Sequence, residues 1–153
     1  MRSIKDLLNE YGESHRNHTN EMIHWICVPV IFFSVVGFLY SVKLPLSILH
    51  FHINAALLAL FLLTLYYMRL SNTLWVGMFL FGGVCLYACH LISTAGYSLW
   101  LVCIILFVAA WIGQFYGHKV EGKKPSFLKD LQFLLIGPAW LMSFIYTKLG
   151  VKI

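Results

Sequence analysis

Charged side chains are scarce in this chain, and long parts of it have none. The sequence contains 11 Lys and Arg and 6 Asp and Glu among 153 residues, and none of them lies between Arg69 and Lys119 or between Asp130 and Lys148. A soluble domain of this size needs a polar shell over its whole surface, which 11% charged residues cannot supply. The absence of charge therefore excludes a soluble domain and predicts an integral membrane protein.

Two further absences narrow the class of protein. The four cysteines form no CxxC pair, so we interpret them as small packing residues and not as a redox pair or a zinc site. The long apolar segments contain no internal Asp, Glu, Lys or Arg. A membrane carrier of protons or ions usually places such groups inside its spans, so the sequence offers no ion pathway.

The apolar segments predict an all-α, polytopic membrane bundle in one domain, residues 1–153. A helix crosses about 30 Å of hydrocarbon with roughly 20 apolar residues, so the neutral stretch after Arg69 must hold two spans. We place the break between them at Ser93–Gly96, a short run of small and polar residues. The four predicted transmembrane helices are residues 25–42, 48–68, 74–92 and 99–117.

The two ends of the chain differ from the spans. Residues 1–24 are polar and lack the pattern of a cleavable signal peptide. Ser3 and Asp6 fit a capping box, and the helix that follows carries an apolar stripe that includes Leu7 and Tyr11, as expected for a helix on the membrane surface. At the other end, residues 131–147 are only marginally long enough to cross and are interrupted by Gly137-Pro138. We expect a re-entrant or interfacial hairpin there.

Basic residues orient the bundle. With four spans, Lys43 lies alone on one side, and the positive-inside rule assigns the more basic side to the cytoplasm. Both termini are therefore expected in the cytosol, and the net charge of +5 indicates contact with anionic lipid heads, not with nucleic acid. The predicted cytoplasmic side carries Arg2, Lys5, Arg16, Arg69, Lys119, Lys123, Lys124 and Lys129.

Histidines gather on the same side. A chain break near Gly12 would allow His15 and His24 to approach each other from two helices, and Gln114, His118 and Glu121 share one face of the last span. Side chains that converge at one end of a helical bundle are a common way to build a metal site, and imidazoles suit Fe, Zn, Cu or Ni. The alternative is that these histidines only contact lipid at the interface. His15, His18, His24 and His118 lie on the inner side, whereas His50, His52 and His90 lie on the outer side.

Two segments resemble the signatures of one family. The first is Tyr11-x3-His15-Arg16-Asn17-x2-Asn20-x3-His24-x4-Pro29, and the second is Trp111-x2-Gln114-Phe115-x-Gly117-His118-x2-Glu121-x3-Pro125, followed by Gly137-Pro138. Together they resemble the 2-hydroxy fatty acid dioxygenase family of fungi and bacteria, over nearly the whole chain. One departure is Cys27, where many members carry Gly, and His18 falls at a variable position of the pattern.

The resemblance implies an Fe(II)-dependent dioxygenase of the endoplasmic reticulum or the bacterial inner membrane that acts in fatty acid α-oxidation. Such an enzyme converts a long-chain 2-hydroxy fatty acid and O₂ into the acid one carbon shorter and CO₂. The resemblance also implies that His15, His24 and His118 are the iron ligands. Asn20 and Glu121 would support them, with Glu121 as a possible fourth ligand. The alternatives are a haem-binding membrane protein and a non-enzymatic membrane scaffold. Lys119, Lys123 or Lys124 could attract the substrate carboxylate.

Overall fold

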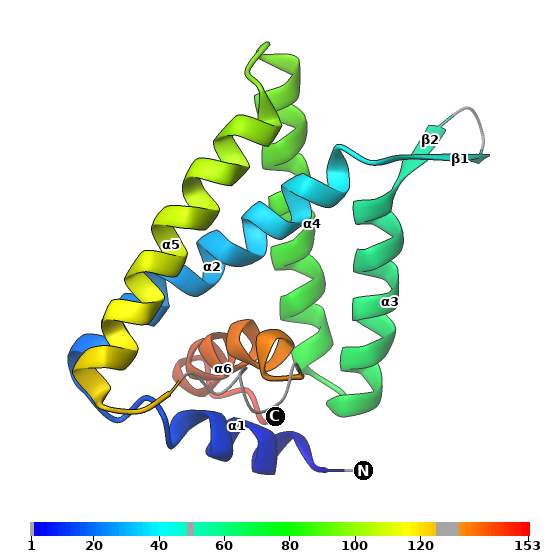
Figure 1. The fold of residues 1–153 in the computed structure, drawn as a ribbon. Helices are drawn as coiled ribbons and strands as arrows, with labels where there is room; N and C mark the ends of the chain where they lie inside the picture. Colours follow the sequence, from blue (N-terminus) through cyan, green and yellow to red (C-terminus); the bar gives the residue numbers. More distant parts are fainter. Residues whose placement is uncertain (1, 49–50, 125–131) are drawn as a thin grey trace.

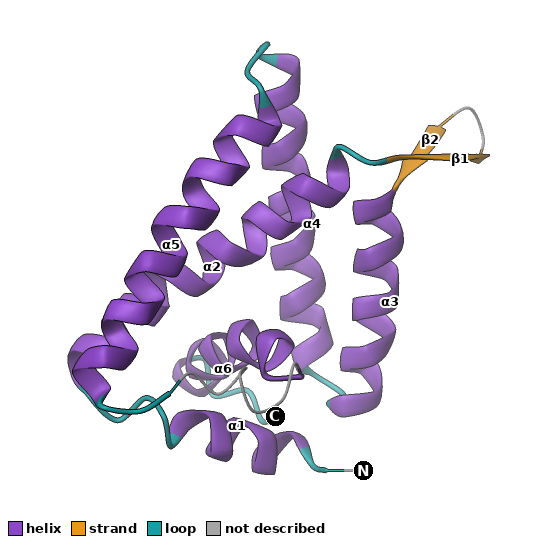
Figure 2. Ribbon diagram, in the orientation of Figure 1, coloured by secondary structure: helices purple, strands orange, loops and turns teal. Residues whose placement is uncertain are grey.

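The structure is a computed structural model that describes residues 2–48, 51–124 and 132–153. Its described part is built almost entirely of helices, which confirms the predicted all-α class (Figure 2). A short antiparallel hairpin is the exception, in which Lys43 pairs with Asn54 and Ser47 with His52. The elements are α1 (Ile4–Gly12), α2 (His18–Tyr40), β1 (Lys43–Ile48), β2 (Phe51–Asn54), α3 (Ala55–Leu70), α4 (Leu74–Thr94), α5 (Leu99–Glu121) and α6 (Gln132–Lys148).

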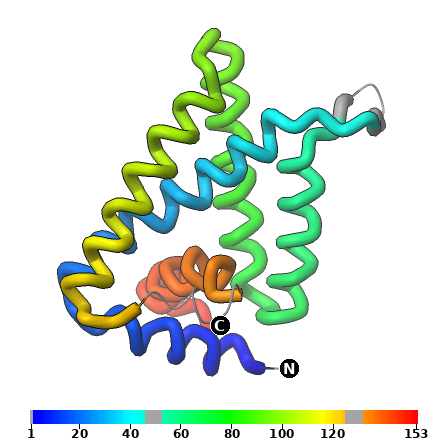
Figure 3. Tube along the Cα trace, viewed as in Figure 1, coloured from blue at the N-terminus to red at the C-terminus, as the bar shows by residue number. Residues whose placement is uncertain are grey.

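Four of the helices run along the length of the molecule, and two lie across one of its ends (Figure 1). The hairpin and the turn between α4 and α5 mark one end, which we call the hairpin end. The α3–α4 connection, the start of α2 and the end of α5 lie at the other end, where α1 and α6 run crosswise beneath the long helices (Figures 1 and 3). We call this the α1/α6 end.

Three of the predicted spans correspond to long apolar helices. In the described part of the chain, α2, α4 and α5 are long and apolar enough to cross a membrane, with 23, 21 and 23 residues. Asn17 caps α2, because its side chain accepts a hydrogen bond from the Thr19 amide. The predicted break between α4 and α5 is also confirmed, and Gly96 adopts the left-handed conformation that such a turn needs, with φ 83°.

The second predicted span begins later than the sequence suggested. Residues 48 and 51–54 belong to the hairpin, and the Asn54 side chain starts α3 by accepting a hydrogen bond from the Leu57 amide at 3.0 Å. The boundary predicted at residue 48 is therefore wrong. With 16 residues, α3 is shorter than the roughly 20 that an untilted span requires. It nevertheless carries the chain from the hairpin end back to the α1/α6 end (Figure 1).

The apolar stripe of α1 faces protein. The capping box forms as predicted, because the Ser3 hydroxyl accepts from the Asp6 amide and the Asp6 carboxylate accepts from the Ser3 amide. Leu7 and Tyr11 are buried, and the Tyr11 ring lies 5.4 Å from the Trp140 ring of α6. The expectation that this stripe rests on the membrane was wrong because α6 lies across the same end of the bundle and offers it an apolar surface.

The expected C-terminal hairpin is also absent, because Gln132–Lys148 forms one continuous helix through Pro138. Proline withdraws a backbone donor from the preceding turn of a helix. In that turn, the Tyr67 hydroxyl of α3 donates to the Leu135 carbonyl at 2.5 Å. At the far end of α6, the Tyr146 hydroxyl donates to the Thr73 carbonyl and accepts from the Gly77 amide, each at 2.9 Å. These hydrogen bonds fasten α6 to α3 and to the start of α4.

This arrangement predicts where the connections lie relative to a membrane. Tyr97, in the α4–α5 turn, and Leu149, just after α6, are both well exposed at opposite ends of the molecule. In a chain whose four cysteines are replaced by alanine, Tyr97→Cys and Leu149→Cys should react with a membrane-impermeant maleimide from opposite sides of oriented vesicles. Labelling of both from one side would contradict this arrangement of α4, α5 and α6.

Candidate metal centre

The site begins with the close approach of α2 and α5. At Gly117 of α5, an added Cβ would overlap the Asn20 side-chain oxygen of α2, and at Gly113 it would come within 2.7 Å of the Cys27 sulfur. Glycine at these two positions, one helical turn apart, lets the two backbones come together, as small residues do between membrane helices. The approach brings the first turns of α2 against the last turns of α5.

Three histidines meet where these helices approach. His15 lies in the short segment between α1 and α2, His24 in α2 and His118 at the end of α5. All three are buried, with exposed fractions of 4%, 0% and 5%. Their ring centroids lie 4.1 to 5.1 Å apart, and one ring nitrogen from each lies within 4.8 Å of the other two. The structure therefore brings together the three residues that the sequence singled out.

Backbone carbonyls set the tautomers of two of these rings. The Nδ1 atom of His15 lies 2.7 Å from the Tyr11 carbonyl, and the Nδ1 atom of His24 lies 2.9 Å from the Asn20 carbonyl. Because a carbonyl oxygen can only accept, each Nδ1 carries the hydrogen. Each Nε2 of the neutral ring is then unprotonated and presents a lone pair, as in histidines that bind metals.

These two unprotonated nitrogens lie close together. The Nε2 atoms of His15 and His24 are 2.9 Å apart, and in these tautomers neither holds a hydrogen to share. Two buried acceptors at this distance repel each other unless a cation lies between them. Imidazole nitrogens bind a transition metal such as Zn²⁺ at roughly 2.0–2.1 Å, so two nitrogens at this distance from each other can both reach one ion. The spacing fits two ligands of one metal ion.

The third ring is also available. Among the described residues, the buried Nδ1 of His118 has no hydrogen-bond partner, which is unusual for a buried polar atom. Burial lowers the pKa of His15 to about 4, although its hydrogen bond to the Tyr11 carbonyl opposes the shift. A ring with that pKa is neutral at physiological pH and can donate its lone pair. The donor set of three neutral imidazoles suits a first-row transition metal and suits Ca²⁺ or Mg²⁺ poorly.

Glu121 and Asn20 hold the segment that carries His15. The Glu121 carboxylate accepts hydrogen bonds from the amides of Arg16 and Asn17, at 3.1 and 2.8 Å. Asn20 donates to the Ser14 carbonyl at 3.1 Å and to Glu121 at 3.3 Å. Both carboxylate oxygens of Glu121 are therefore engaged with N–H donors next to the start of α2, where the helix dipole favours an anion.

Aromatic rings cover the site from the α1/α6 end. The Tyr11 ring stacks on His15, with centroids 4.3 Å apart and planes 15° apart, and Trp140 of α6 lies 5.2 Å from the same imidazole. Neither residue was predicted at the site from the sequence. The four-residue spacing of Tyr11 and His15 was an available signal for the first. No local pattern connects Trp140 to a histidine so distant along the chain.

The other candidate residues lie elsewhere. His18 is exposed at the start of α2, and His90 lies on α4, where its Nδ1 is 3.3 Å from the Tyr40 hydroxyl. His50 and the side chain of His52 fall outside the described part of the structure, as do Pro125 and Lys129. The Lys123 ammonium donates to the Glu13 carbonyl at 2.7 Å, whereas Lys119 and Lys124 are exposed beside the site.

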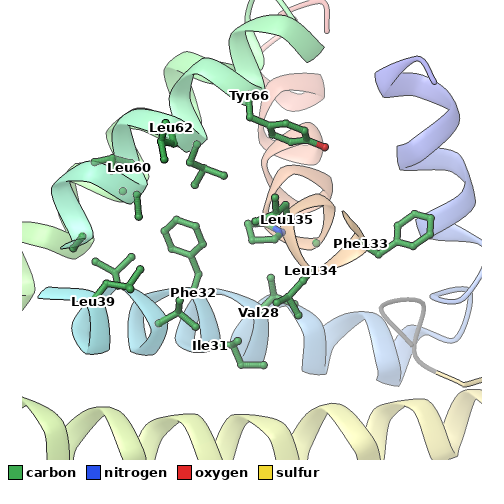
Figure 4. A pocket seen from close by; sticks show the side chains of 18 of the residues that line it. Val28, Ile31, Phe32, Leu39, Leu60, Leu62, Tyr66, Phe133, Leu134 and Leu135 are labelled. Carbon is green, nitrogen blue, oxygen red and sulfur yellow. The ribbon is translucent and has the colours of Figure 1, made fainter. Parts of the chain in front are cut away.

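An apolar cavity of about 470 Å³ adjoins the histidines. His118, Gln114 and Tyr11 line it at the α1/α6 end, and side chains of α2, α3, α4 and α6 enclose the remainder. Figure 4 shows this lining, with Val28, Ile31, Phe32 and Leu39 on α2, Leu60, Leu62 and Tyr66 on α3, and Phe133, Leu134 and Leu135 on the segment of α6. Its volume lies in the range of small-molecule pockets in proteins.

Comparison with known proteins identifies the family. The family described as 2-hydroxy-palmitic acid dioxygenase Mpo1-like matches residues 1–149. The chain belongs to this family. A protein of Saccharomyces cerevisiae named 2-hydroxy-palmitic acid dioxygenase MPO1 is 32% identical to it over 149 residues, which cover 96% of this chain and 82% of the yeast protein. No solved structure matches the chain. The Mpo1-like assignment confirms the resemblance that the two histidine-containing segments carry.

The tight contact at Gly117 provides a test of the site's construction. Gly117→Ala should force α2 away from α5, because the new methyl group meets an Asn20 side chain fixed by its hydrogen bonds. We expect a loss of about 1–3 kcal/mol in the free energy of unfolding, as for overpacked positions. Thermal unfolding in detergent would measure it. Gly83→Ala is the matched control, because a Cβ there meets nothing within 4 Å. Equal stability of both variants would show that the approach is not tight.

Proposed function

We propose that this protein is an Fe(II)-dependent dioxygenase of long-chain 2-hydroxy fatty acids. The reaction is R–CH(OH)–COOH + O₂ → R–COOH + CO₂ + H₂O, in which oxidative cleavage of the C1–C2 bond releases the four electrons that reduce one O₂. The facing imidazoles of His15 and His24 beside His118 are the observation that carries the proposal. The printed name of the yeast relative, a 2-hydroxy-palmitic acid dioxygenase, supports the substrate class.

Three imidazoles suit the metal that this reaction needs. We infer that His15, His24 and His118 hold one Fe(II), because imidazole is a good ligand for iron and because three protein ligands leave coordination positions free. Bound iron would supply the redox and Lewis-acid chemistry that couples oxidation of the 2-hydroxy acid to reduction of O₂. The surrounding residues prepare the ligands. The Tyr11 and Asn20 carbonyls fix two tautomers, and the rings of Tyr11 and Trp140 exclude water from His15.

Asn20 and Glu121 act through the ligands in this proposal. Both oxygens of Glu121 accept hydrogen bonds from backbone amides, which favours a positioning residue over a fourth ligand. Asn20 joins Glu121 to the Ser14 carbonyl, so the segment before α2 is tied to the end of α5 on both sides of His15. Supporting groups of this kind orient metal ligands and tune their affinity.

We further propose that the α1/α6 end faces the cytosol, in the endoplasmic reticulum or in a bacterial inner membrane. The basic residues near this end, including Arg16, Arg69 and Lys119, follow the positive-inside rule. The exposed Lys119 and Lys124 lie near the histidines and can attract the carboxylate of a fatty acid, whereas Lys123 is engaged with Glu13.

The geometry argues against the haem alternative. Two axial imidazoles lie on opposite sides of an iron ion, which separates their nitrogens by about 4 Å at ordinary metal–nitrogen distances. The 2.9 Å between the His15 and His24 nitrogens is too short for that arrangement. A non-enzymatic membrane scaffold would leave the orientation of the three rings without a purpose. Metal analysis decides between a scaffold and the proposed iron enzyme.

The first test is iron content. Detergent-purified protein, reconstituted with Fe(II) without oxygen, should bind about one iron per chain by elemental analysis. His15→Ala, His24→Ala and His118→Ala should each lose most of it, because each substitution removes one of three ligands. His18→Ala is the matched control, since His18 is exposed at the same end of the molecule and lies outside the cluster. Retention of iron in the three variants would remove these histidines from the site.

Activity gives the second readout. The iron-loaded protein should consume one O₂ for each 2-hydroxyhexadecanoic acid and release the acid one carbon shorter, and the three alanine variants should fall by at least about a hundredfold. A protein that binds no transition metal and turns over no 2-hydroxy acid would favour the scaffold.

Glu121→Gln distinguishes a positioning residue from a ligand. Glutamine keeps the shape and the acceptor oxygen of the side chain but loses the charge that faces the two amides. We expect the variant to bind iron with unchanged stoichiometry and with about 10–100-fold weaker affinity, as for supporting residues at other metal sites. Competition with a chelator would measure the affinity. Complete loss of iron in Glu121→Gln, with the fold intact by circular dichroism, would make Glu121 a ligand.

A further inference from the structure

The cavity beside His118 is polar at one end only. Its polar lining residues His118, Gln114 and Tyr11 lie at the α1/α6 end, with Tyr66 near the end of α3. Toward the hairpin end, the side chains that line it are aliphatic or aromatic hydrocarbon, including Val35 and Leu39 of α2 and Ala56 of α3. A ligand that fits this cavity has a polar head at the histidines and an apolar tail that points toward the hairpin end.

The depth of the cavity matches a long acyl chain. The lining residues of α2 run from Val28, one turn beyond His24, to Leu39. Eleven residues of helix rise by roughly 16 Å. The hydrocarbon of one bilayer leaflet is about 15 Å thick, half of about 30 Å, and is spanned by one long acyl tail. A tail of that length that begins at the level of Val28, one turn beyond His24, would therefore end at the level of Leu39.

The cavity also opens sideways between helices. Leu62 of α3 and Leu134 of α6 both line it while remaining 56% and 40% exposed, and Leu135 does the same at 38%. Their combination of exposure and contact with the cavity indicates that it opens between α3 and α6, and Figure 4 shows where the three leucines lie in the lining. Because these three leucines present hydrocarbon to the outside, a fatty acid dissolved in the membrane can pass its tail between them into the cavity without passing through water.

Small residues shape the deep part of the cavity. Ala56 and Ala59 lie three residues apart on α3, so they share one face and are separated by about 4.5 Å along the helix. Leu60 continues that face, opposite Gly82 of α4, where an added Cβ would overlap the Leu60 side chain. A larger side chain at either alanine would enter the deep part of the cavity, and one at Ala59 would reach it closer to the histidines.

We propose that this cavity binds the acyl tail of the substrate and that Ala56, Ala59 and Leu39 set the longest chain the enzyme accepts. The tail lies between α2, α3 and α4, and the 2-hydroxy carboxylate lies beside His118. The proposal rests on the dioxygenase function proposed above, because that function supplies the ligand's head group. It adds the orientation of the tail and the residues that limit its length.

Graded substitutions test the length limit. Ala59→Phe should lower kcat/KM for 2-hydroxyhexadecanoic acid by about tenfold or more, while kcat/KM for 2-hydroxydecanoic acid changes by less than about twofold, because only the longer tail meets the new ring. Ala56 lies farther from the histidines than Ala59, so the longest acid that Ala56→Phe accepts should be longer than the longest acid that Ala59→Phe accepts. The reverse change, Leu39→Ala, should raise kcat/KM for acids longer than 16 carbons.

Matched controls separate the cavity from general damage to the protein. Ala109→Phe adds the same ring on the exposed face of α5, outside the cavity lining, and should leave the chain-length profile of the wild type. Every variant should bind iron as the wild type does, since the substituted positions lie far from the histidines. A shift of the same size in Ala109→Phe, or an equal loss for short and long acids in Ala59→Phe, would overturn the length limit.

A photoreactive substrate tests the tail position without requiring turnover. With a diazirine at the terminal carbon of 2-hydroxyhexadecanoic acid, irradiation should label peptides that contain Leu39, Ala59 or Leu60. With a diazirine near C3, it should label the last turns of α5 and the start of α6. Labelling in this pattern without iron binding or turnover would sustain the cavity proposal and overturn the dioxygenase function. Turnover with terminal labelling only at outward-facing residues such as Phe61 would overturn the cavity proposal alone.

Discussion

The approach of two imidazole nitrogens to 2.9 Å, each with its hydrogen directed away to a carbonyl, is the contact around which the α1/α6 end is organised. It is unfavourable by itself, because two lone pairs face each other out of water. Three features of the surrounding structure hold the two imidazoles in this position. The glycine at 117 lets α5 reach α2, and Glu121 fastens the segment that carries His15. The packing of α1 on α6 closes the site from below.

Much of this arrangement could be predicted because its signals are local or additive. The absence of charge identifies the long helices, and side-chain caps such as Ser3 and Asn17 mark where helices begin. The sorting of basic residues places the three histidines at one end before any contact is known. Convergence of the three imidazoles then follows from topology, since side chains at one end of a small bundle have few directions available.

The misplaced features depend on contacts between distant segments. A glycine and a proline within a short apolar segment suggested a hairpin, but α6 is one continuous helix, to which Tyr67 of α3 donates a hydrogen bond and whose own Tyr146 donates to the Thr73 carbonyl before α4. The apolar stripe of α1 was also misassigned, to the membrane surface, because its true partner is distant in the chain. Nothing local in the sequence shows that Trp140 of α6 packs against Tyr11. The deep cavity is also non-local, because residues of six helices line it.

The bond from Glu121 to the Arg16 amide joins residues 105 positions apart in the chain, and this separation imposes an order on biogenesis. His15 and His24 leave the ribosome early, whereas the third imidazole and the carboxylate arrive only when α5 has been synthesised and inserted. The complete site therefore cannot form on a nascent chain that ends before α5. Under the proposed function, metal loading is then a late step of maturation that follows the insertion of α5, and a chain truncated within α4 lacks one of the three proposed ligands.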